Sequence, residues 1–131
     1  MAKLRQLVKM QKGILLFSNN AVAKQLVSLP RTATLIGIMT QVVTPFDDTG
    51  TNLIQIGTKG DPNYFVADFS ASAAGFQVNT LLLGGSLEEL GFGGPVVDVW
   101  ATYTGSNTNS TAGKAIVIVV YADPFVNPGA A

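Results

Sequence analysis

From about Ala33 onward, the apolar residues come in short runs that are separated by residues typical of turns. Each run has the length of a β-strand, and each break carries Gly, Asn, Asp or Thr, so the pattern predicts antiparallel β-structure. We expect strands over residues 33–43, 52–56, 76–83, 96–103 and 115–121. Asp47 and Asp48 lie in the break between the first two strands, where carboxylates ordinarily cap backbone N–H groups of a turn.

Two of these strands have informative patterns. Apolar residues at positions 97, 99 and 101 alternate with Asp98, Trp100 and Thr102, which predicts a strand with one buried and one wetter face. The run from Ile116 to Val120 is apolar at every position. A continuous run of this kind predicts a central strand that is covered on both faces.

Helix is scarce in this pattern. Ser86 and Glu89 have the spacing of a capping box, but Gly91 ends that helix after about one turn. Asp61 and Pro62 are expected to open a second short helical turn that runs through Ala67.

The spacing of the strands predicts the fold class. We expect an all-β sandwich or jelly roll of seven or eight short antiparallel strands with minimal helix. Residues 32–131 form the sandwich body in this interpretation. Residues 1–31 are either a basic N-terminal arm that lies on a neighbouring subunit or the first strands of the domain.

The chain has no net charge, but its positive charge is concentrated at the N-terminal end. Six of the eight basic residues and none of the eight acidic residues fall within residues 1–31. Such asymmetry indicates a partner. We predict that these residues bind an acidic protein surface through their charge and by adding a strand to a sheet of the neighbour. The alternative is that they form a solvent-exposed face without a partner. The six residues are Lys3, Arg5, Lys9, Lys12, Lys24 and Arg31.

Nucleic acid and membrane partners are not expected. The basic residues are widely spaced and have only Phe17 as an aromatic neighbour, unlike the dense platforms that bind nucleic acid. No apolar run approaches the ~18 residues of a membrane span. Only 12% of the 131 residues are charged, as is common in subunits that are partly covered in an assembly. We therefore expect self-association, as a homotrimer.

The residue types exclude most enzyme chemistry. The chain has no His and no Cys, which removes Ser-His-Asp triads, cysteine nucleophiles and the usual zinc ligands. A glycosidase that uses two carboxylates remains chemically possible. However, Asp47 and Asp48 lie in a turn, and Glu88 and Glu89 are adjacent on a one-turn helix and cannot face one cleft together. Calcium binding by Asp47, Asp48 and Asp61 has the right ligand type without the spacing of an EF-hand. We expect no catalytic activity and no cofactor.

Several segments carry a family resemblance. Residues 42–57 read VVTPFDDTGTNLIQIG, residues 61–65 read DPNYF, residues 100–105 read WATYTG and residues 112–115 read AGKA. Over about residues 38–122 the chain resembles small virion proteins of tailed bacteriophages, namely head decoration (cement) and head-fibre proteins.

The resemblance implies a function without catalytic residues. It implies a structural protein that is made in the host cytoplasm and clamps subunits of the major capsid protein from the outer surface of the phage head. A head-fibre, tail-fibre or neck protein is one alternative. Another is a carbohydrate-binding β-sandwich that would place Trp100, Tyr103 and Tyr64 on an exposed face.

Overall fold

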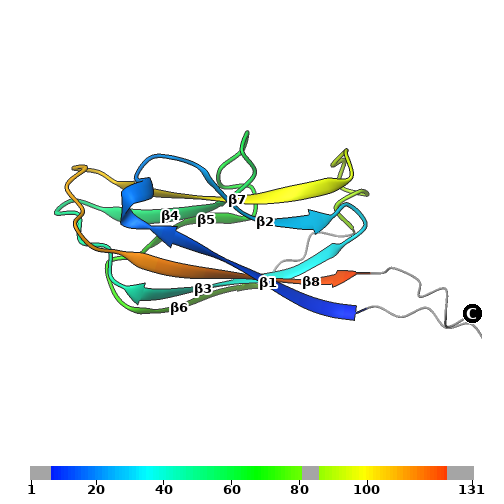
Figure 1. The fold of residues 1–131 in the computed structure, drawn as a ribbon, viewed down its shortest axis with the longest axis horizontal. Coiled ribbons are helices and arrows are strands. Elements are labelled where there is room, and N and C mark those ends of the chain that lie inside the picture. The colour runs from blue at the N-terminus through cyan, green and yellow to red at the C-terminus, as the bar shows by residue number, and fades with distance from the viewer. Residues whose placement is uncertain (1–6, 81–85, 124–131) are drawn as a thin grey trace, which may run out of the picture.

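The computed structural model describes residues 7–80 and 86–123, which form eight strands and one 3-10 turn. The strands make two four-stranded antiparallel sheets that face each other as a β-sandwich (Figure 1). The predicted fold class is therefore confirmed. In chain order the elements are β1 (Leu7–Leu16), η1 (Phe17–Asn19), β2 (Lys24–Pro30), β3 (Thr34–Thr44), β4 (Asn52–Gly57), β5 (Val66–Ser70), β6 (Gly75–Thr80), β7 (Val96–Gly105) and β8 (Lys114–Asp123).

We name each sheet after one of its two inner strands. The β8 sheet has the order β1-β8-β3-β6, and the β7 sheet has the order β2-β7-β4-β5. Alternate residues of each strand point into the space between the sheets, which forms the core. On β7 the inward residues Val97, Val99 and Ala101 are buried, whereas Asp98 and Trp100 lie on the outer face, as the alternation predicts.

The strand β8 is central, as predicted, but only one of its faces is covered by the described part of the chain. It pairs with β1 from Leu7↔Asp123 to Leu16↔Lys114 and with β3 on its other side. Val117 and Val119 are fully buried between the sheets, whereas Ile118 on the outer face is half-buried. The prediction of cover on both faces is therefore wrong for the described residues, since its apolar outer positions face away from the core.

The described part of the N-terminal segment forms the first strands of the sandwich. β1 belongs to the β8 sheet and β2 to the β7 sheet, and they contribute Leu15 and Leu29 to the core with no exposed surface. The two strands approach each other closely at Gly13, where a Cβ atom would lie 2.6 Å from the Cβ of Leu26. Glycine at this position allows β1 to pass next to β2.

The expected strands are present with small changes of boundary. The strand expected over residues 76–83 corresponds to β6, and its residues 81–83 lie outside the described residues. The helical turn expected to run through Ala67 is wrong, because β5 begins at Val66 and pairs with β4. The capping box is confirmed: the Ser86 N–H donates to Glu89 Oε1 at 3.2 Å, and the Glu89 N–H donates to Ser86 Oγ at 3.3 Å. Gly91 follows this turn with φ of 98°.

Candidate partner-binding surfaces

The basic residues predicted to bind a partner are distributed over two strands and a turn. Lys12 is exposed on β1, and Lys24 is half-buried at the start of β2. Lys9 Nζ lies 3.2 Å from Asp123 Oδ2, and Arg31 Nε lies 3.4 Å from Glu88 Oε2. Two of the four described basic residues thus have acidic neighbours within the chain, which leaves less of their charge for a partner.

The other two residues of the predicted set, Lys3 and Arg5, lie outside the described residues. Partner binding by the whole set stays a prediction. Nevertheless, the strands β1 and β2 that carry the described lysines lie beside each other at one side of the sandwich (Figure 1). The fold therefore gathers the lysines along one side.

The acidic pair in the turn after β3 joins two loops. Asp48 is buried, and its Oδ1 accepts the N–H groups of Gly50 at 2.7 Å and of Asn107 at 3.0 Å. Its Oδ2 accepts the N–H of Asn109 at 3.0 Å. The capping expectation is confirmed and extends further than expected, because Asp48 also holds the loop between β7 and β8.

Asp47 binds the same loop at a second point. Its Oδ1 accepts the N–H groups of Thr111 at 2.7 Å and Ala112 at 2.9 Å, and its Oδ2 accepts the Thr111 hydroxyl at 2.7 Å. The Thr111 hydroxyl is the main cause that lowers the pKa of Asp47 below the ordinary value of 3.8. Burial opposes ionisation of Asp48, but the N–H donors of its loops outweigh it and also lower its pKa.

These carboxylates already have donors for their oxygen atoms, so their arrangement is typical of loop fixation. In the described parts of the chain, no group of three or more Asp or Glu side chains is placed to hold a metal ion. Those same parts include no helix that is long and apolar enough to cross a membrane.

Tyr103 lies in the core, whereas the carbohydrate hypothesis requires it on an exposed face. Its side chain has no exposed surface, and its ring centroid lies 4.4 Å from that of Phe46. Its hydroxyl donates to Asn52 Oδ1 at 2.6 Å and shares a short hydrogen bond with Ser110 Oγ. Burial is the main cause that raises the pKa of Tyr103. The alternation that buries residues 97, 99 and 101 also predicts an inward position 103, so the signal was present in the sequence.

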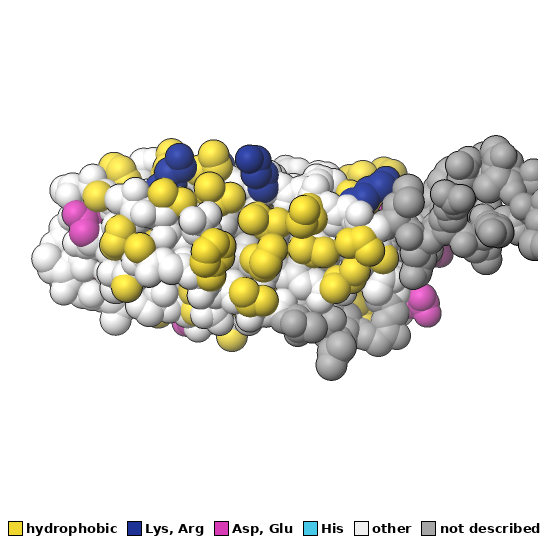
Figure 2. Space-filling view, turned by 90° about the horizontal axis from the view of Figure 1, so that it is seen from below, with side chains coloured by type: hydrophobic (Ala, Val, Ile, Leu, Met, Phe, Trp, Pro, Cys, Tyr) yellow, Lys and Arg dark blue, Asp and Glu magenta, His cyan; other side chains and the backbone are white. Residues whose placement is uncertain are grey.

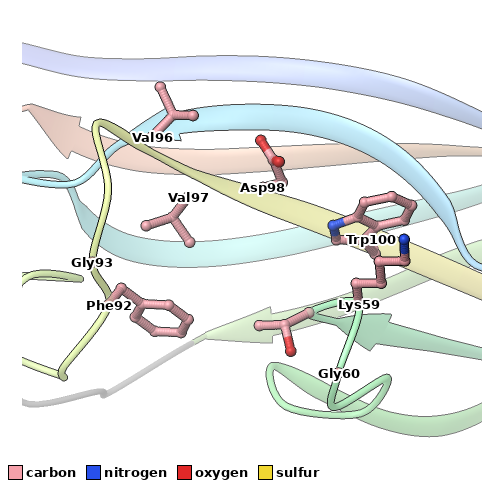
Figure 3. A pocket seen from close by; sticks show the side chains of 9 residues that line it. Lys59, Gly60, Phe92, Gly93, Val96, Val97, Asp98 and Trp100 are labelled. Atoms are coloured by element: carbon pink, nitrogen blue, oxygen red, sulfur yellow. The ribbon is translucent and has the colours of Figure 1, made fainter.

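The outer face of the β7 sheet carries a shallow depression of about 290 Å³ next to Trp100 (Figure 3). Lys59 Nζ lies 5.5 Å from the centroid of the Trp100 ring, within the range of a cation–π contact. The Asp98 carboxylate also lines the depression and accepts a hydrogen bond from the Ser28 hydroxyl at 2.5 Å. Thr58, Gly60, Phe92, Gly93, Val96 and Val97 complete the lining.

The fold is similar to chains in two solved phage capsids. A chain in the acidic stable capsid structure of Helicobacter pylori bacteriophage KHP30 superposes with a TM-score of 0.66 at 21% identity, with 97% of each chain covered. A chain in the capsid asymmetric unit of cyanophage Pam1 superposes with a TM-score of 0.64 at 22% identity, with 91% of this chain and 86% of that chain covered. No protein-family model and no curated protein sequence matches the chain. At these identities the likeness establishes the fold.

Proposed function

We propose that this chain is a non-enzymatic structural protein of a phage virion, which decorates the outer surface of the capsid and cements the shell by binding subunits of the major capsid protein. The observation that carries this proposal is the likeness to a chain in the KHP30 capsid structure, because it extends over 97% of both chains. The chain in the Pam1 capsid structure supports it independently. The resemblance of residues 38–122 to small virion proteins points the same way.

Cementing requires only differential binding. A protein that binds the assembled shell and not its separated subunits stabilises the shell by the free energy of that binding. The composition suits such a role, because only 12% of the residues are charged and the described surface has several large exposed apolar side chains. Within this proposal, the basic residues of the N-terminal segment contact acidic groups of the shell, and the chain associates as a homotrimer.

The test is a comparison of particles with and without this chain. We would delete its gene from the phage that encodes it and measure the temperature at which purified particles release their DNA. Particles that lack the chain should release DNA at a lower temperature, and addition of the purified protein should restore the original value. A density map of the intact particle should place the sandwich on the outer surface of the head. Density in the neck or tail, or unchanged particle stability, would contradict cementing.

Carbohydrate binding is a second candidate, which the depression beside Trp100 favours. Sugar rings stack on aromatic side chains, and the Asp98 carboxylate in the lining can accept hydrogen bonds from sugar hydroxyl groups. Of the three aromatic residues that this hypothesis invokes, Trp100 lines the depression and Tyr64 is 40% exposed, whereas Tyr103 is buried.

A glycan array with the purified protein distinguishes this candidate. Binding that is lost in Trp100→Ala and retained in a Phe76→Ala control would support it, because Phe76 is an exposed aromatic residue on the other sheet. Absence of binding to every glycan would leave the cementing proposal alone.

A further inference from the structure

The two outer faces of the sandwich differ in character. On the β7 sheet, the outward side chains include polar groups that bond to one another beside the apolar Val96 and Trp100: the Ser28 hydroxyl donates to Asp98, and the Gln55 amide donates to Asp68. Such a face is suited to water. The outer face of the β8 sheet, which we call the apolar face, presents mainly aliphatic and aromatic side chains (Figure 2).

The apolar face extends across all four strands of its sheet. The strand register places Lys12, Ile118, Met39 and Val78 in one row from β1 to β6, and every member except Lys12 is apolar. Its most exposed members lie at the two edge strands, where Met10 is 67% and Val78 is 62% exposed. Further exposed apolar members are Val8, Ile14 and Phe76.

The apolar face is large for the surface of a monomer. From the exposed fractions of its side chains, the apolar face covers about 500 Å², near the upper end of the patches that monomers expose. A standard protein interface buries about 800 Å² on each partner. The apolar face with a rim of polar neighbours is therefore large enough to form the centre of a specific contact.

Charge indicates which partner fits. The outward charged residues of the four strands in the described range are Lys12 on β1 and Lys114 at the start of β8, and none is acidic. Figure 2 shows the basic side chains along one margin of the patch and no acidic side chain within it. In a face-to-face contact between two copies, neither face would supply a carboxylate from the described strands to pair with these lysines, so a partner that carries carboxylates fits better.

We infer that the apolar face of the β8 sheet docks on the capsid shell, against a surface of the capsid subunits with an apolar centre and carboxylates that face Lys12 and Lys114. This inference rests on the proposed function and names the surface that performs it. In this orientation the polar face of the β7 sheet, with the depression at Trp100, points to solvent. The docking surface is thus the exposed side of the sheet itself, together with Lys12 of β1 and Lys114 of β8.

The test introduces one carboxylate into either face. Val78→Asp changes the apolar face, and Val96→Asp is the matched control because Val96 is a valine at the start of β7 with 49% exposure. The probe is the capsid particle prepared without this chain, and binding is measured by cosedimentation. We expect Val78→Asp to bind about tenfold more weakly or worse, and Val96→Asp to bind as the wild type does. Met10→Asp, at the other edge of the face, provides a second variant if the melting temperature of Val78→Asp is lowered.

The outcomes separate the two hypotheses. If the wild type does not bind the particles, the proposed function fails. If the wild type binds and correctly folded Val78→Asp and Met10→Asp bind equally well, the proposed function stands and the apolar face is not the docking surface. Sedimentation of the wild type and the variants without particles measures whether each of them self-associates. If the variants lose only self-association and still bind particles, the face belongs to a contact between copies, and the inference is overturned.

Discussion

The hydrogen bonds around Tyr103 provide a sharp test of how the loops are held on the sandwich. The Tyr103 hydroxyl donates to Asn52 Oδ1 at 2.6 Å and also bonds to Ser110, and Asn52 in turn binds the backbone N–H and carbonyl of Asp48 at 3.0 Å each. Tyr103→Phe removes only the hydroxyl and leaves the ring against Phe46. The variant therefore isolates these bonds from the packing of the core.

The expected cost follows from what remains after the substitution. Asn52 Oδ1 keeps the Asp48 N–H as a donor, and half-buried Ser110 can bond to water. No buried polar atom of Asn52 is stranded, so we expect Tyr103→Phe to lower the free energy of unfolding by about 1–2 kcal/mol. For a domain of this size that corresponds to roughly 4–8 °C in melting temperature. Asn52→Leu should cost about 3–5 kcal/mol, because it removes the bonds to Asp48 as well.

Urea unfolding monitored by fluorescence measures both values, with Tyr64→Phe as the control. Tyr64 is 40% exposed, and within the described residues its ring packs against Phe65 and Phe92. Its conversion to Phe should change stability by less than about 0.5 kcal/mol. If Tyr103→Phe is equally neutral, the hydroxyl contributes nothing to loop fixation and the reasoning is refuted.

Three further predictions concern other parts of the molecule. Folding lowers the pKa of Asp48, so the stability that its ionised carboxylate contributes is fully present above the ordinary pKa and is lost as pH falls through the pKa of the folded state. We therefore expect Asp48→Asn to be less stable than wild type at pH 7. In thermal unfolding, this difference should shrink from about pH 5 toward pH 2. Gly13→Ala should destabilise the protein by about 1–3 kcal/mol, because its Cβ would lie 2.6 Å from that of Leu26, whereas Gly60→Ala, with nothing near its Cβ, should be tolerated in the same urea experiment. Joint replacement of four basic residues by Gln should weaken cosedimentation with particles at low salt, and the loss should shrink above ~0.15 M salt; unchanged binding at low salt would mean that their charge is not used. Those four are Lys3, Arg5, Lys9 and Lys12.

The sequence allowed the sandwich to be predicted because its signals are local. Alternation along residues 96–103 and the apolar run at 116–120 identify strands without knowledge of their neighbours. The strand β5 was missed because Asp61 and Pro62 gave a local signal for a helical turn, whereas its pairing of Val66 with Ile56 joins residues ten positions apart. Register and pairing depend on the complete sheet, which no local window contains.

The candidate site was harder to predict than the fold. The clustering of basic residues in the first 31 positions is visible in the sequence, but the division of Lys12 and Lys24 between two sheets is not. The ion pair between Lys9 and Asp123 joins opposite ends of the chain. A count of basic residues in the N-terminal segment therefore overstates how many are available to a partner, because acidic residues far along the chain pair with Lys9 and Arg31.

The mistaken expectation about β8 is the most informative difference. A continuously apolar strand predicts cover on both faces, and the described chain covers one of them, with Val117 and Val119 in the core and Ile118 outside. Since inward and outward residues alternate along a strand, folding depends on one set and docking can depend on the other. Selection for a bound partner would keep both sets apolar, whereas a free monomer would gain solubility from polar outward residues. The sequence of β8 is thus better suited to a strand whose outer face is buried against another molecule.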